Sequence, residues 1–196
     1  VSQTCWYPAY NVMDTFTTDA TGTVTLPESL VPGTYYVRET SAKEPYLVGG
    51  EIEVNIPADI NLTPVAIVSY YNHAATGNIR IVKTDAVDGS SLAGAIFEIR
   101  ASGDIVRPDG SIAALDGETV ATVTTDETGE ARADDLPLGS GTARYEVVET
   151  QAPAGFLLDR TSHIVDLTYA DQKTPVVEAR LNVSDDYTKV DISKVD

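Results

Sequence analysis

Short runs of alternating apolar and polar residues extend along the whole chain, and turn-forming residues separate them. Runs of this length that are rich in Val, Ile, Thr and Tyr are typical of β-strands, in which every second side chain shares a face. The turn signals between them are DATG (19–22), VPG (31–33), RPDG (107–110), DETG (126–129) and APAG (152–155). The pattern predicts an all-β protein, a sandwich or barrel of short strands.

Ionisable residues occur in phase with apolar residues at the ends of two predicted strands. Lys83 follows Ile79 and Ile81 on one face, and Glu149 follows Tyr145 and Val147. Alternation therefore predicts that both charged groups point toward the core. Burial disfavours the charged form of each group, so a lysine and a glutamate placed there are candidates for chemistry as well as for an ion pair.

The chain also repeats itself at a long and nearly constant interval. The segment TTDATG (17–22) recurs as TTDETG (124–129), and IRIVKTD (79–85) recurs as VDISKVD (190–196). Glu39 corresponds to Glu149 and Asn72 to Asn182, and the two offsets are equal (149 − 39 = 182 − 72). The interval is close to the length of a sandwich domain, roughly 100 residues, and is too long for a solenoid unit.

The repeat divides the chain into three predicted parts. We predict a domain at 1–75 that lacks its first strand, a complete domain at 76–185 and the opening strand of a further repeat at 186–196. Because the chain does not begin with Met, we expect it to be a piece of a longer protein.

The same polar positions recur in the incomplete parts. Glu39 follows Tyr35 and Val37 in phase, and Asn72 follows Val68 and Tyr70. Lys194 follows Val190 and Ile192 in the same way. Each of these is a member of an incomplete trio, since the lysine for Glu39 and Asn72 is expected upstream of Val1 and Lys194 has no acid or Asn in this chain.

Composition excludes several classes of function. The formal net charge of −17 argues against nucleic acid and against an anionic membrane surface, and no apolar run is long enough to span a bilayer. The single cysteine, Cys5, excludes an internal disulfide framework and a cysteine-based metal site, and an incidental thiol is its simplest interpretation. His73 and His163 have no zinc-like spacing, and turn chemistry accounts for the Asp-rich turns. We predict no metal and no cofactor.

A buried lysine, glutamate and asparagine can react with one another. A neutral lysine amine is a nucleophile, and a protonated glutamate can donate a hydrogen bond to an amide carbonyl and shuttle protons. Attack of Lys83 on Asn182, with ammonia leaving and Glu149 as the catalytic acid, would yield an isopeptide bond. The competing interpretation is an ordinary buried salt bridge between Lys83 and Glu149, with Asn182 capping a loop.

The segment ARYEVVETQAPAGF (143–156) resembles the GxYxVxETxAPxGY signature of Cna-B-type domains, which are also called SpaA-like or prealbumin-like. LAGAIFEI (92–99) and the opening IVKTD (81–85) are similar to the same family. The resemblance implies tandem prealbumin-like, Ig-like β-sandwich domains from adhesins or pilins of Gram-positive cell surfaces. It also implies that Lys83, Glu149 and Asn182 are the bond-forming lysine, the catalytic acid and the bond-forming asparagine.

Two features depart from the family pattern. ETSAKEPY (39–46) has Lys43 and Pro45 where the family has Pro and Gly, so a different turn is expected after Glu39. Strict alternation puts Asn182 in phase with Glu178 and Arg180, whereas Val177, Ala179 and Leu181 form the apolar face. We therefore expect a bulge or an edge position that turns Asn182 inward.

Three classes of function follow from these observations. The first is a structural stalk repeat of an extracellular, cell-wall-anchored surface protein, whose partners are the neighbouring repeats of its own chain. The second is an adhesin module that binds a host protein or glycan and contains only the buried salt bridge. The third is a turnover enzyme, which the repeated scaffold disfavours, because any catalysis by Glu149 would be a single self-crosslinking event. We predict the first.

Overall fold

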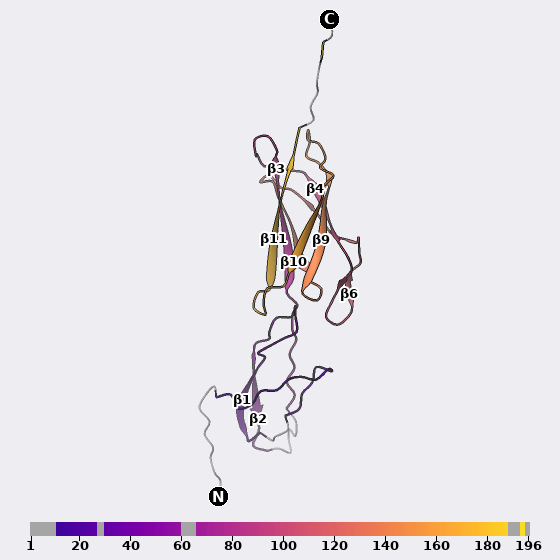
Figure 1. Ribbon diagram of the computed structural model, residues 1–196. Coiled ribbons are helices and arrows are strands. Elements are labelled where there is room, and N and C mark those ends of the chain that lie inside the picture. Colours follow the sequence, from indigo (N-terminus) through magenta and orange to yellow (C-terminus); the bar gives the residue numbers. More distant parts are fainter. Residues whose placement is uncertain (1–10, 27–29, 60–65, 188–192, 195–196) are drawn as a thin grey trace. The chain divides into compact units, whose positions relative to one another are not determined.

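The protein is built from β-strands and turns, and its computed structural model describes residues 11–26, 30–59, 66–187 and 193–194 (Figure 1). Within these ranges there is no helix, and therefore none with the length and apolar character that a membrane crossing requires. The prediction of an all-β fold is confirmed. The chain divides into two compact units, Val1–Tyr36 with Glu53–Ile67, and Val37–Ile52 with Val68–Asp196.

Most of the strands lie between residues 76 and 185. They are β3 (Thr76–Asp85), β4 (Ile96–Ala101), β5 (Ile105–Val106), β6 (Ile112–Ala114), β7 (Thr119–Thr124), β8 (Glu130–Pro137), β9 (Thr142–Gln151), β10 (Ser162–Thr168) and β11 (Val176–Asp185). Two further strands, β1 (Gly33–Arg38) and β2 (Glu51–Ile56), pair with each other. The strand order is β10-β9-β4-β7 in one sheet and β11-β3-β8 in another, and β5 pairs with β6.

β3 is the central strand of its three-stranded sheet. It pairs in parallel with β11 along the whole length of both strands, and antiparallel with β8. A parallel pair cannot be joined by a tight turn, so everything between β3 and β11 in the sequence belongs to the connection between them. The first and last strands of this part of the chain are therefore direct neighbours.

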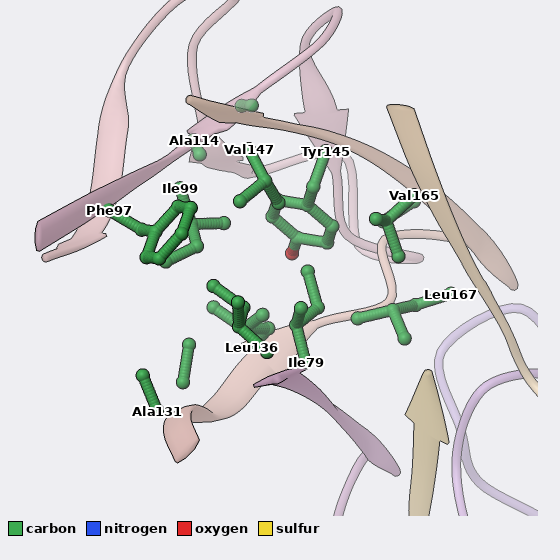
Figure 2. Packing of buried hydrophobic residues seen from close by; sticks show 14 of the residues in the cluster. Ile79, Phe97, Ile99, Ala114, Ala131, Leu136, Tyr145, Val147, Val165 and Leu167 are labelled. Carbon is green, nitrogen blue, oxygen red and sulfur yellow. The ribbon is translucent and has the colours of Figure 1, made fainter. Parts of the chain in front are cut away.

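The hydrophobic core lies between the four-stranded and three-stranded sheets. Figure 2 shows Phe97 and Tyr145, from β4 and β9, on the side of the core opposite Ile79 and Leu136, from β3 and β8. These four side chains are at most 3% exposed. Because side chains alternate along each strand, these residues point to the core-facing side of their sheets, as the sequence predicts.

The internal repeat is visible in the hydrogen bonds of its turns. Asp126 Oδ1 accepts hydrogen bonds from the backbone N–H groups of Thr128 and Glu130, at 2.8 and 3.1 Å. Asp19 Oδ1 accepts from the corresponding N–H groups of Thr21 and Thr23 at the same distances. The turn that contains Asp126 also requires a glycine at 129, where φ is +75° and an added Cβ would lie 2.5 Å from the carbonyl oxygen of Lys83.

Tyr145 connects the core to the chain segment before β9. Its side chain is fully buried, and its hydroxyl donates a 2.6 Å hydrogen bond to the carbonyl oxygen of Pro137. Tyr35, its counterpart in the preceding repeat, donates a similar 2.8 Å bond to the carbonyl oxygen of Val31 at an exposed site. The two tyrosines make the same kind of bond in different solvent environments.

We predict that Tyr145→Phe lowers the free energy of unfolding by about 1–2 kcal/mol, because the partly buried Pro137 carbonyl loses its partner. Tyr35→Phe is the matched control, and it should cost about 0.5 kcal/mol or less because water can replace the lost hydroxyl. Urea unfolding of both variants measures the difference. Equal effects of the two substitutions would contradict this account of Tyr145.

Candidate functional site

Lys83 lies near the end of β3 with its side chain fully buried. It is in phase with Ile79 and Ile81, so the alternation that builds the core also carries the ammonium group into it. The backbone is held on both sides, since Lys83 N–H donates to the Gly129 carbonyl at 2.8 Å and Leu92 N–H donates to the Lys83 carbonyl at 3.0 Å. The sequence prediction that Lys83 points inward is therefore correct.

Two buried carboxylates surround the Lys83 ammonium. Glu149 Oε1, from β9, lies 3.0 Å from Nζ, and Asp185 Oδ1, from β11, accepts a hydrogen bond from Nζ. Glu149 and Asp185 are 3% and 2% exposed. The Phe97 ring completes the surroundings, with its centroid 5.6 Å from Nζ. One cation and two carboxylates thus meet where water is excluded.

Asn182 does not belong to this group, and the prediction that it faces Lys83 is wrong for this structure. Its side chain is exposed, and its Oδ1 accepts a 3.2 Å hydrogen bond from Arg180 Nε on the outer face of β11. The expected bulge is absent, because β11 pairs with β3 in continuous register from Val176 to Asp185. Without a bulge, residue 182 keeps the outward direction of Glu178 and Arg180.

Asp185 is the residue that the sequence analysis missed, although the signal was available. The apolar face of Val177, Ala179 and Leu181 continues through Val183 to Asp185 by the same alternation that identifies Lys83 and Glu149. The error came from applying the offset between the two glutamates (149 − 39) to the third residue of the trio, for which the offset is three residues larger (185 − 72). Side chains alternate between the two faces with a period of two, and three is an odd number. An error of three residues in the correspondence between the repeats therefore exchanges the inward face for the outward one.

The environment of Glu149 favours its protonated form. Desolvation by burial raises the pKa of Glu149 above its ordinary value of 4.5, and the nearby Asp185 charge adds to this effect. The Lys83 ammonium and the backbone N–H of Asp159 act in the opposite direction. Asp159 N–H donates to Oε2 at 2.9 Å, which leaves Oε1 directed toward Lys83.

A related pair is present in the preceding repeat. Glu39 Oε1 accepts a 2.8 Å hydrogen bond from Asn72 Nδ2, and Glu39 Oε2 accepts a 2.6 Å bond from Gly49 N–H. Gly49 and Asp159 each follow their glutamate by ten residues, so the same backbone group orients both carboxylates. Asn72 therefore corresponds in position to Asp185, and this offset (185 − 72) is larger than the one between the two glutamates (149 − 39).

The remaining candidates from the sequence have different outcomes. Cys5 lies outside the described residues, as does most of the strand predicted at 186–196, so the role of Lys194 stays a prediction. Within the part of the chain that the structure describes, no three His, Cys, Asp or Glu side chains are grouped as a metal ion would require.

The trio of Lys83, Glu149 and Asp185 has the components of an amide-forming site. One ammonium balances one carboxylate, so the second carboxylate is more stable with a proton in this dry environment. Nζ is a nucleophile once it gives up its proton, Asp185 Cγ is the electrophile beside it, and Glu149 is placed to transfer protons between them. The three side chains lie on rigid strands, which fixes their proximity.

The comparisons with known proteins agree with this fold. The model of the SpaA family, described as a prealbumin-like fold domain, matches residues 6–69 and 77–182. A Bacillus anthracis structure, the TIE protein, is 24% identical over 80% of this chain with a TM-score of 0.51, and the match covers 25% of that structure. No curated protein matches the chain.

Two further solved structures are similar over part of the chain. The pilus 2b backbone protein of group B streptococcus is 21% identical over 84% of this chain, with a TM-score of 0.43 and 52% of its own length covered. The major pilin SpaD of Corynebacterium diphtheriae is 26% identical over 58% of this chain, with a TM-score of 0.40 and 30% of its length covered. The chain thus spans about a quarter to a half of these proteins.

We predict that Lys83→Met makes stability fall as pH rises above 4.5, the ordinary pKa of Glu149. The substitution removes the influences of Lys83 that lower this pKa, so the folded state holds the Glu149 proton more tightly than the unfolded state. Stability then decreases with pH until the folded pKa is passed. Urea midpoints across this range measure the effect, and Lys83→Met with Glu149→Gln should show a weaker pH dependence. A Lys83→Met midpoint that rises with pH would contradict the assignment.

Proposed function

The chain belongs to the family of SpaA prealbumin-like fold domains, and from this premise we propose that it is part of a structural stalk of a Gram-positive surface protein. In this proposal the repeat at 76–185 is locked by an isopeptide bond between Lys83 and Asp185, formed with the help of Glu149. The observation that carries the proposal is the buried contact of the Lys83 ammonium with both carboxylates.

The proposed reaction is balanced without any co-reactant. The Lys83 ammonium and the Asp185 carboxylate condense to a secondary amide, a bond forms between Nζ and Cγ, and one Asp185 oxygen leaves as water. Two protons pass from Nζ to the departing oxygen through Glu149, which in each transfer donates one proton to that oxygen and accepts one from Nζ, so it ends in its starting protonated state. Burial favours this outcome, since the amide is neutral whereas the starting groups are charged.

The position of the proposed bond accounts for a mechanical role. β3 opens the repeat and β11 closes it, so a chain pulled from both ends transmits force through these two strands. A covalent bond from Lys83 to Asp185 would carry this force past the residues between them. The tandem family matches support an array in which each repeat is loaded in series.

The expected product is a chain lighter than its sequence by the mass of one water, with a branched proteolytic peptide that joins Lys83 to Asp185. Asp185→Asn should still react but should lose ammonia instead, because the leaving group changes. Asn182→Ala is the matched control and should keep the water loss. Intact mass spectrometry and peptide mapping test all three chains. Full calculated mass for the unmodified chain would overturn the proposal.

We predict that Glu149→Ala keeps the fold, blocks the bond and lowers the melting temperature. The lost cross-link spans 102 residues in sequence, and by analogy with a disulfide its removal costs roughly 4–5 kcal/mol of unfolding free energy. Glu146→Ala, on the opposite face of β9, is the control that should leave the mass deficit unchanged. Calorimetry and intact mass measure both variants. A mass deficit that persists in Glu149→Ala would show that Glu149 is not the proton-transfer group.

A further inference from the structure

The segment 39–48 makes the same hydrogen bonds to the chain that follows it as its counterpart 149–158, although the turns differ as expected, with a cis Glu44–Pro45 peptide bond in one and a positive φ of 90° at Gly155 in the other. Leu47 N–H donates to the His73 carbonyl at 2.9 Å, and Leu157 N–H donates to the Asp186 carbonyl at 2.9 Å. Isolated antiparallel bridges join Tyr46 to Ala74 and Phe156 to Tyr187. Residues 72–74 therefore correspond to residues 185–187, in agreement with the match between Asn72 and Asp185.

The two segments differ in what covers them. Residues 42–48 contact loops of the repeat that follows in the sequence, all within one compact unit. Val48 N–H donates to the Gln172 carbonyl at 3.3 Å, and Gln172 Nε2 donates to the Ala42 carbonyl at 2.6 Å. Lys43 Nζ donates to the Pro108 carbonyl at 3.1 Å.

The apolar residues of the segment show the same difference. Leu47 packs against the core cluster, which is formed by residues between 75 and 183, and Pro45 is fully buried. Their counterparts are uncovered, since Leu157 is 52% exposed and Gly155 is exposed. Beside Leu157, the Phe156 ring stacks on Tyr187 at 4.8 Å, and Tyr187 is 41% exposed. We call Phe156, Leu157 and Tyr187 the end patch.

We propose that the end patch is a docking surface for a further SpaA-like repeat, the one that the VDISKVD motif at 190–196 would open. The partner would contribute the equivalents of Gln172 and Pro108, and it would cover Leu157 as the second repeat covers Leu47. Leu157 and Tyr187 are both exposed and Phe156 is partly exposed, and exposed apolar side chains favour such a contact. Tyr187 lies three residues before the start of that motif in the sequence, so the partner would be tethered at high local concentration.

Amide hydrogen exchange tests the proposal in two chains, this one and the natural chain extended past Asp196 through the next repeat. In this chain the Val48 amide should be protected, whereas the Leu158 amide, its counterpart, should exchange at least ten times faster. In the extended chain the Leu158 amide should become protected to a similar degree as Val48. The readout does not depend on the isopeptide bond and should be the same in Glu149→Ala.

Matched variants make the outcome specific. Leu157→Asp should abolish the protection of Leu158 in the extended chain, while Ile164→Asp, at a position that is 55% exposed on β10, should leave it intact. Gln172→Ala removes the hydrogen bond from Gln172 Nε2 to the Ala42 carbonyl and should lower the protection of the Val48 amide. This variant leaves the sequence of the segment 39–48 unchanged. Equal exchange of Leu158 in both chains would overturn the proposal. So would protection of Leu158 in this chain that rises with protein concentration, because a second copy would then be the partner.

Discussion

Burial of the Lys83 ammonium is the constraint on which the rest of the site depends. An ion without water must find opposite charge within the protein, and Lys83 has Glu149 and Asp185 from two different sheets around it. Burial, together with the neighbouring Asp185 charge, raises the pKa of Glu149, so this carboxyl group keeps its proton to a higher pH than an exposed glutamate does. The arrangement is costly as a salt bridge, but it holds an acid, a nucleophile and an electrophile in contact.

Strand topology explains why a bond within this cluster would resist a pulling force. Because β11 pairs with β3 in parallel, the first and last strands of the repeat are neighbours, with Lys83 beside Val183 and Asp85 beside Asp185. Asp185 therefore lies two positions beyond the pairing partner of Lys83, on the same face of the sheet. Glu149 reaches them across the core from β9, oriented by the Asp159 N–H group. The Gly49 N–H group orients Glu39 in the same way. This hydrogen bond is therefore a shared feature of both repeats and is not confined to the repeat at 76–185.

Much of this could be predicted from alternation and repetition. The inward positions of Lys83 and Glu149 follow from a period of two, because strands of this length are buried on one face. The identity of the third residue could not be obtained from the repeat offset, because two copies of a strand need not have equal lengths. The local alternation from Val177 to Asp185 was the better guide, since pairing with β3 enforces it. The contacts around Leu47 could not be predicted, because they join segments far apart in the sequence.

Single-molecule pulling of this chain between its ends tests the central claim most directly. If Lys83 and Asp185 are joined, the residues between them cannot extend, and the unfolding step of this repeat should be absent from the wild-type traces. Glu149→Ala should restore a step whose length corresponds to release of that segment, at roughly 3.3–3.6 Å per residue. A full-length step in the wild-type chain, equal to that of Glu149→Ala, would contradict the account.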